Sequence, residues 1–385
     1  MTTGTVPVSR LLTGRTVLFL LAALSAATSF YLLLTVVPLY TVTRPGAQPA
    51  AAGLATAVLM LTTVAAELAA PRVIARIGRR AALASSLVLL GPPALILPVS
   101  DHQATVLGVC GLRGLGFGLA VVIGSAWMAD LVPSARRAEG LGVYGAVMGM
   151  PAIVALPLGV WLVDRVGFNP VFDAAAVTAL AGLIPLLALP PGYPSFGPSR
   201  LGVLSGLRLG ALARPAVVFA ATATAAGILV TFLPLAATQS TVVAPALLIQ
   251  AGSATFGRWW AGRHDSRGAG RLLVAGAVTA AMGLLAFVLV DRPVAVLAGA
   301  AAFGLGFGVA QNASISLMFR SVPESAYDTA SAVWNIAYDA GMGVGAAAFG
   351  LLVGITGFAA GFALAAALIP VTLVTLRPHS RKDQQ

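Results

Sequence analysis

Three ionisable residues interrupt stretches of this sequence that are otherwise apolar: Asp339, Arg113 and Glu67. A charge at the centre of a lipid bilayer costs at least about 2.5 kcal/mol, so it is rarely retained there without a function. Carboxyl groups in such places commonly relay protons. We therefore treat the three residues as candidates for proton coupling across a membrane, and Asp339, near the middle of its apolar run, is the first choice.

Two of the three have a structural alternative. Arg113 could brace its part of the protein by bonding backbone carbonyls, or could extend its charge to the membrane surface. Glu67 lies near the end of its apolar run and could pair with Arg72 or Arg76 at the interface. For Glu67 we favour this pairing over a role as a proton carrier.

Asp339 shares one helical face with Trp334, Asn335, Tyr338 and Met342, because these residues recur at intervals of about four. An aromatic and amide face around an acid is typical of a binding surface. A mostly apolar cavity of this kind suits an amphipathic or aromatic small molecule. Further candidates for its lining are Ser25, Ser29, Tyr31, Trp127, Gln311 and Asn312.

The elements that carry these residues are transmembrane helices. With 58% hydrophobic and 9% charged residues, the 385-residue chain has too little polar surface for a water-soluble globule. Its apolar runs have the length of about 20 residues that a helix needs to cross a bilayer. We predict an all-α membrane protein with twelve spans, near residues 16–42, 50–71, 81–100, 104–129, 140–163, 170–190, 216–238, 242–262, 271–290, 294–319, 328–352 and 357–376.

The distribution of charge predicts the orientation of the spans. If the N-terminus is cytoplasmic, nineteen of the 23 basic residues fall on the inner side, and only Arg44, Arg165 and Arg292 fall in outer loops. This positive-inside bias places both termini in the cytoplasm and the protein in the cell membrane. The net charge of +11 then reflects topology and anionic lipid, not nucleic acid.

Other kinds of chemistry lack support in the sequence. Cys110 is the single cysteine and cannot form an internal disulfide. We find no metal-ligand spacing, no nucleophile–base pair and no motif for a cofactor. We therefore expect no metal, no cofactor and no enzyme activity.

The sequence repeats itself with an offset of 190 residues. Residues 114–120 read GLGFGLA and residues 304–310 read GLGFGVA. Gly78 corresponds to Gly268, and Gly167 to Gly357, in the same register. An even number of helices per copy makes this a parallel duplication. We predict an N-terminal six-helix bundle at 1–190, a cytoplasmic linker at 191–215 and a C-terminal bundle at 216–385.

The repeated glycines lie in mid-membrane helices, where small residues let helix backbones approach closely. A dinucleotide-binding fingerprint would need a preceding strand, and none is expected. We assign a packing role to Gly114, Gly116, Gly118, Gly304, Gly306 and Gly308.

With two parallel six-helix halves joined by a basic loop, the chain resembles the major facilitator superfamily over essentially its whole length. In that family the loop after the second helix typically reads Gly-x-x-x-Asp-Arg-x-Gly-Arg-Arg, and here residues 71–80 read PRVIARIGRR. Arg76, Gly78, Arg79 and Arg80 match, whereas the first Gly and the Asp are replaced. The resemblance implies that helices one, four, seven and ten line a central cavity.

The two halves exchange charges at these loops. By the offset, Asp265 takes the place of Ala75, and Arg320 takes the place of Asp130 at the end of helix four. We predict two ion pairs, Arg76 with Asp130 and Asp265 with Arg320, that hold the loops to helix ends and favour the outward-facing state. The alternative is that these arginines only set topology, since exposed ion pairs are often weak.

Antiporters of the family often carry Gly-Pro-x-x-Gly-Gly in helix five, and residues 155–160, ALPLGV, retain Pro157 and Gly159. The resemblance therefore favours an exporter: a monomeric secondary transporter that uses protons to expel an amphipathic small molecule, a drug or a metabolite, by alternating access. The alternative is proton-coupled or facilitated uptake of a sugar or other nutrient. A receptor or lipid scramblase is a third class.

Overall fold

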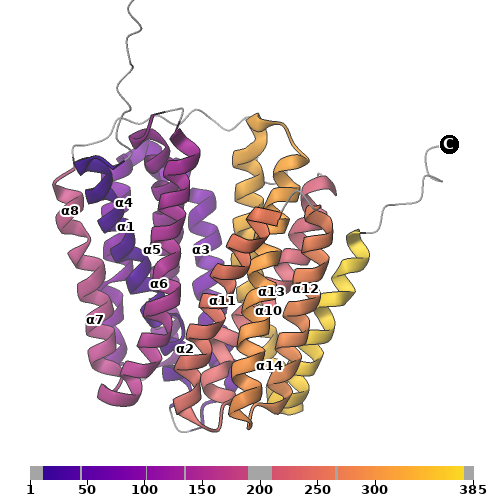
Figure 1. Cartoon of the computed structure of the whole chain (residues 1–385). Helices are drawn as coiled ribbons and strands as arrows, with labels where there is room; N and C mark the ends of the chain where they lie inside the picture. Colours follow the sequence, from indigo (N-terminus) through magenta and orange to yellow (C-terminus); the bar gives the residue numbers. More distant parts are fainter. Residues whose placement is uncertain are drawn as a thin grey trace, which may run out of the picture.

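The computed structural model describes residues 12–43, 46–100, 102–133, 136–189, 210–264 and 268–376. Within these ranges the chain is almost entirely helical, and they contain no β-strand (Figure 1). The predicted all-α class is confirmed. Eleven segments are long and apolar enough to cross a membrane, and the last of them is long enough to do so twice.

The helices of the first half follow the expected spans. They are α1 (Gly14–Leu34) with α2 (Val36–Thr41), α3 (Pro49–Ile77), α4 (Arg79–Leu90) with the 3-10 helix η1 (Pro92–Val99), α5 (Gln103–Leu131), α6 (Arg137–Val166), and α7 (Phe168–Ala181) with α8 (Leu183–Leu187).

The helices of the second half are α10 (Gly210–Ala236), η3 (Ser240–Val242) with α11 (Val243–His264), α12 (Ala269–Leu285) with η5 (Ala286–Leu289), α13 (Pro293–Arg320), η6 (Glu324–Ala326), and α14 (Tyr327–Thr372) with η7 (Leu373–Leu376). The predicted linker at 191–215 ends too late, because α10 is already helical from Gly210. Residues 190–209 lie outside the description.

Helix α14 is two spans joined at a bend. Gly357 within it has a φ of 74°, which is not helical. The ring centroids of Phe349 and Phe362, on either side of the bend, are 5.1 Å apart. At a rise of about 1.5 Å per residue, a continuous helix would hold these rings far apart. The chain therefore reverses at Gly357, and the structure contains the twelve expected spans.

Glycines with positive φ mark corresponding junctions in the two halves. Gly78 and its counterpart Gly268 have φ of 79° and 103°, and Gly167 and its counterpart Gly357 have φ of 82° and 74°. Residues with a Cβ rarely adopt this conformation, so each junction depends on glycine. The 190-residue offset of the sequence is thus also an offset of the fold.

The repeated glycines lie where helices touch. A Cβ on Gly114 or Gly118 would collide with backbone carbonyls of α3, and one on Gly116 would meet a carbonyl of α4. In the second half, Gly304 and Gly308 lie equally close to α11, and Gly306 to α12. Gly159, in the same helix as Pro157, lies against the Leu32 carbonyl of α1.

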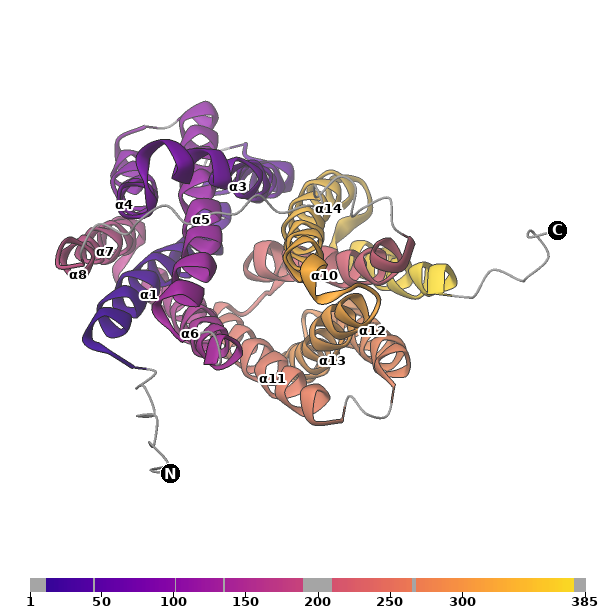
Figure 2. The same ribbon diagram turned by 90° about the horizontal axis from the view of Figure 1, so that it is seen from above.

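The two halves form separate bundles that meet along a seam. Viewed from above, the indigo-to-magenta helices lie on one side and the orange-to-yellow helices on the other (Figure 2). Helix α3 packs against α14, and α6 packs against α11. We refer to these contacts between the halves as the seam.

Candidate functional site

The side chains of Glu67 and Asp339 meet across the seam. Glu67 lies on α3 and Asp339 on α14, and their exposed fractions are 9% and 6%. Helix α3 packs against α14, and the two carboxyl groups are close enough to interact electrostatically. Any hydrogen bond formed between two carboxyl groups requires a proton on at least one of them. The structure thus brings together two of the three sequence-predicted proton-coupling residues, one from each half.

Within the described ranges, no basic side chain forms an ion pair with either carboxyl group. Among the described residues, the ion pairs involve Arg79 with Asp130 and Arg136 with Glu139, and neither Glu67 nor Asp339 takes part. The preferred pairing of Glu67 with Arg72 or Arg76 is therefore wrong, because the α3 helix turns Glu67 towards α14. Two ionised carboxylates at this separation would repel each other strongly.

Two tyrosines lie near Asp339, and the exposed Arg258 lies within electrostatic range of both tyrosines. Tyr31 of α1 and Tyr338 of α14 are both within electrostatic reach of Asp339 and of Arg258. In the sequence, Arg258 is one of the nineteen basic residues expected on the inner side. Its place on α11, well before the helix ends at His264, is the signal that could have separated it from the loop arginines. Four helices, two from each half, thus contribute to one polar cluster.

Each tyrosine is backed by the phenylalanine of the repeated glycine stretch. The ring of Tyr31 lies edge-on to Phe117, with centroids 6.1 Å apart, and Tyr338 lies 6.1 Å from Phe307. Phe117 and Phe307 occupy the same position in the two copies of the sequence. The glycines therefore seat α5 and α13 against their neighbours, and the phenylalanine between them supports a polar aromatic ring at the seam.

An aromatic stack extends from Tyr338 along the second half. Trp334 lies 4.5 Å from Phe219 at an interplanar angle of 11°, and its indole N–H donates to the Ser314 hydroxyl at 2.9 Å. Asn335 on the same helix is half-buried. The predicted face around Asp339 is therefore partly occupied by internal packing.

Among the remaining predicted cavity residues, Trp127 belongs to helix packing, whereas Gln311 and Asn312 have unpaired amide oxygens. Trp127 is buried against Phe19, with centroids 5.5 Å apart. Gln311 and Asn312 have side-chain oxygens that are buried without a hydrogen-bond partner, and Asn312 lies near Gly262 of α11. These amides could still accept a hydrogen bond from a ligand.

Arg113 braces the first half. Its guanidinium donates to the carbonyl of Ser29 at 2.7 Å and to that of Leu90, and the side chain is only 2% exposed. It therefore connects α5 to α1 and to the end of α4. These bonds match the alternative in which Arg113 braces its part of the protein through backbone carbonyls. Arg113 therefore has no role in the proton pathway proposed below.

The predicted ion pair of Arg76 with Asp130 is wrong. Asp130 pairs with Arg79, whereas Arg76 is exposed. Gly78 ends α3, so Arg79 becomes the first residue of α4 and its side chain is buried against the end of α5. Arg80, the next residue, donates to the Leu187 carbonyl at 2.6 Å. The loop is thus tied to two neighbouring helices.

The second predicted pair is not described in full. Asp265 lies outside the described residues, and Arg320 is exposed at the end of α13. The pairing of Asp265 with Arg320 stays a prediction.

At one end of the seam, α3 contacts helices of the second half directly. The hydroxyls of Thr56 on α3 and Thr231 on α10 are 2.9 Å apart and buried. A Cβ on Gly53 would collide with the Ala346 carbonyl of α14, and Gly350 of α14 lies against the backbone of Pro49 and Ala50. All these contacts lie towards the Pro49 end of α3, which the charge pattern places outside.

Comparison with known proteins points to one family. Residues 19–346 match the model of the Major Facilitator Superfamily. The chain is 26% identical over 96 residues to the multidrug transporter protein MdtP of Bacillus subtilis (strain 168), a match covering 25% of this chain and 18% of that protein. It is 30% identical over 121 residues, 30% of this chain and 18% of the relative, to the MFS-type transporter Rv1877 of Mycobacterium tuberculosis (strain ATCC 25618 / H37Rv). The matched region thus covers less than a fifth of either relative.

Solved structures of similar fold cover nearly the whole chain. A POT family transporter in complex with 5-aminolevulinic acid has a TM-score of 0.77 at 12% identity, covering 94% of this chain and 95% of that one. The inward open conformation of the xylose transporter XylE from E. coli has a TM-score of 0.73 at 14% identity, covering 96% and 97%. At these identities the likeness concerns the fold alone.

Proposed function

Because the chain belongs to the major facilitator superfamily, we propose that this transporter expels an amphipathic small molecule in exchange for protons. The observation that carries the proposal is the proximity of two buried carboxyl groups, Glu67 on α3 and Asp339 on α14, where these helices pack across the seam. A proton-binding group that joins the two halves is placed to link protonation to their relative movement. We further propose that the protein resides in the cell membrane with both termini in the cytoplasm, and works as a monomer.

The carboxyl pair offers a simple coupling mechanism. With a proton bound, Glu67 and Asp339 can share a hydrogen bond and hold α3 against α14. When both are ionised, repulsion between them favours separation of the helices at this level. A proton taken up from one side and released to the other would then accompany each rocking of the halves. Tyr31, Tyr338 and the unpaired amide oxygens of Gln311 and Asn312 are the proposed contacts for the substrate.

Two observations support the proposed direction of transport. The similarity to MdtP and the retained Pro157 and Gly159 on α6 favour export. Uptake that is accelerated by inward proton flow would instead select a nutrient importer.

The test is transport in a host that lacks its own pumps. Cells expressing the protein are screened with toxic amphipathic compounds, and accumulation is measured with and without a protonophore. We expect lower accumulation of at least one compound, and the protonophore should abolish this effect. Asp339→Asn and Glu67→Gln should each remove pH-driven export while the protein remains in the membrane.

A matched control is Asp164→Asn, which changes an exposed carboxyl group near the end of α6. This variant should export normally. Export against a gradient by Asp339→Asn would show that the carboxyl pair is structural and would overturn the proposed coupling.

A further inference from the structure

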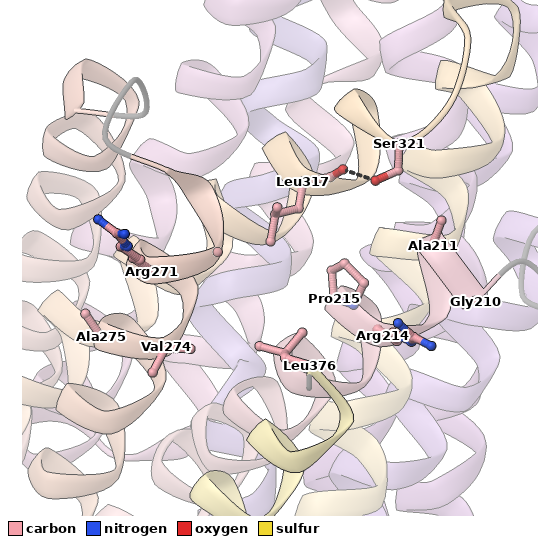
Figure 3. Close-up of a pocket in the computed structure, with 11 residues that line it drawn as sticks. Gly210, Ala211, Arg214, Pro215, Arg271, Val274, Ala275, Leu317, Ser321 and Leu376 are labelled. Carbon is pink, nitrogen blue, oxygen red and sulfur yellow. Dashed lines mark hydrogen bonds between the residues drawn. The ribbon is translucent and has the colours of Figure 1, made fainter. Parts of the chain in front are cut away.

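The second half contains a hollow where four helical segments end together. It has a volume of about 690 Å³. The hollow lies between the starts of α10 and α12 and the ends of α13 and η7 (Figure 3). Its lining includes Arg214, Gly270, Arg271, Leu317 and Leu376. Neither residue of the carboxyl pair lines the hollow, and the proposed transport mechanism does not use it.

The hollow combines an apolar wall with positive charge. Arg214 and Arg271 lie on opposite sides of it, with Leu317 and Leu376 between them (Figure 3). None of its lining residues is acidic. Two helix N-termini, at Gly210 and Ala269, contribute backbone N–H groups that have no partner within their own helices. Such a surface favours a ligand with an anionic head and an apolar body.

The internal repeat shows that the hollow is not a general consequence of the fold. Leu317 corresponds to Trp127, which is only 4% exposed and packs against Phe19. Gly270 corresponds to Arg80, which reaches the Leu187 carbonyl at 2.6 Å and so crosses the corresponding place in the first half. A Cβ on Gly270 would meet nothing within 4 Å. The second half thus lacks both side chains that fill this place in the first.

We propose that this hollow binds an anionic phospholipid, with its headgroup at the rim where the exposed side chains of Arg214 and Arg271 lie and the start of an acyl chain against Leu317 and Leu376. Helices α10 and α12 begin, and α13 and η7 end, on the side that the charge pattern assigns to the cytoplasm. In the membrane leaflet on that side, basic pockets between helices bind anionic headgroups. The proposal rests on that orientation and not on the proposed direction of transport or on its coupling to protons.

The test measures lipid retention by the purified full-length chain. The protein is exchanged into vesicles of phosphatidylcholine with or without phosphatidylglycerol, extracted in a neutral detergent, and examined by native mass spectrometry. We expect the wild type to retain phosphatidylglycerol in preference to phosphatidylcholine. Arg214→Gln with Arg271→Gln should weaken retention about fivefold for each arginine removed. Arg72→Gln, at an exposed arginine of the other half, should leave it unchanged.

A second variant fills the hollow without changing its arginines. Leu317→Trp with Gly270→Arg copies the residues of the first half, and should abolish retention while the protein stays folded. Equal retention by the wild type and by either double variant would overturn the site, as would equal retention of the two lipids. Thermal unfolding with inorganic phosphate tests the free anion: stabilisation equal to that by phosphatidylglycerol would also overturn the lipid proposal. Because no arm measures transport, failure here would leave the proposed function untouched.

Discussion

Arg79 and Arg80 are adjacent in the sequence but hold different helices. Successive residues of a helix point about 100° apart, so the first turn of α4 directs Arg79 to Asp130 on α5 and Arg80 to the Leu187 carbonyl at the end of α8. The loop between α3 and α4 is therefore fixed to two neighbours within its own half. These contacts tie α4 to α5 and α8 at the end of the first half where α3 gives way to α4.

The ion pair of Arg79 with Asp130 predicts a measurable loss of stability. Arg79 is buried, and removing Asp130 would leave its charge without this partner. Because Asp130 is 35% exposed, we expect Asp130→Ala to cost on the order of 1 to 3 kcal/mol, not the larger cost of a fully buried pair. The measurement is the midpoint of thermal unfolding in detergent.

Exposed Arg76 provides the matched control for this experiment. Arg76→Ala should change the stability by less than about 0.5 kcal/mol. The charge-swapped double variant, Arg79→Asp with Asp130→Arg, should recover part of the loss. If Arg76→Ala proved as harmful as Asp130→Ala, the sequence-based pairing would be right after all.

The error over Arg76 has a physical cause. Three arginines lie within five residues of the loop, and the sequence gives no distance from any of them to Asp130. The partner is decided by where α3 ends and α4 begins, because this fixes the direction of each side chain. That boundary is set by the positive φ of Gly78. The glycine was recognised in the sequence, but its geometry was not.

At the scale of the helix, the glycines of α5 are not equivalent. Gly118 lies against the Thr63 carbonyl of α3, whereas a Cβ on Gly108 in the same helix would meet nothing within 4 Å. Gly118→Ala should therefore force α5 away from α3 and destabilise the protein by about 1 to 3 kcal/mol. Gly108→Ala should be neutral or slightly stabilising, because alanine favours the helix.

Thermal unfolding and the yield of folded protein in detergent distinguish these outcomes. The repeat provides an independent copy of the test, since Gly308 lies against the Ala254 carbonyl in the second half. Gly308→Ala should behave like Gly118→Ala. Tolerance of alanine at both positions would mean that the repeated glycines are not packing sites.

The helices were predictable from the sequence because the bilayer fixes their length and composition. The thickness of the hydrocarbon sets a run of about 20 residues, and the charged loops mark its ends. The meeting of Glu67 with Asp339 was not predictable. It depends on how each helix is rotated about its axis, and a helix that is apolar on nearly every side gives little indication of that rotation. Asp339 was predicted to be functional from the sequence, but its neighbour Glu67 could be identified only in the folded chain.

At the scale of the whole molecule, the two halves are in direct contact at one end of the seam. Thr56 touches Thr231, and Gly53 and Gly350 seat α3 directly against α14. These contacts lie on the side that the charge pattern places outside the cell. With this orientation, the structure corresponds to a state whose outer entrance is shut, and alternating access requires these contacts to break once in each cycle.

A cross-link between Thr56 and Thr231 should therefore stop transport. Thr56→Cys with Thr231→Cys places two thiols where the hydroxyl oxygens are 2.9 Å apart. Oxidation should join α3 to α10 and hold the outer side shut, so that export falls to the level of cells without the protein. A reductant should restore it. The single cysteine of the natural sequence, Cys110, is buried, so background cross-linking should be low.

The two single-cysteine variants, treated with the same oxidant, separate this effect from damage by oxidation, and both should keep transporting. Formation of the cross-link is followed independently by cutting the chain between the halves and observing whether they stay together on a non-reducing gel. A fully cross-linked protein that still exported its substrate would show that the Thr56 contact need not open. In that case the halves could not work by rocking about this seam, and the carboxyl pair would have to move protons without separating α3 from α14.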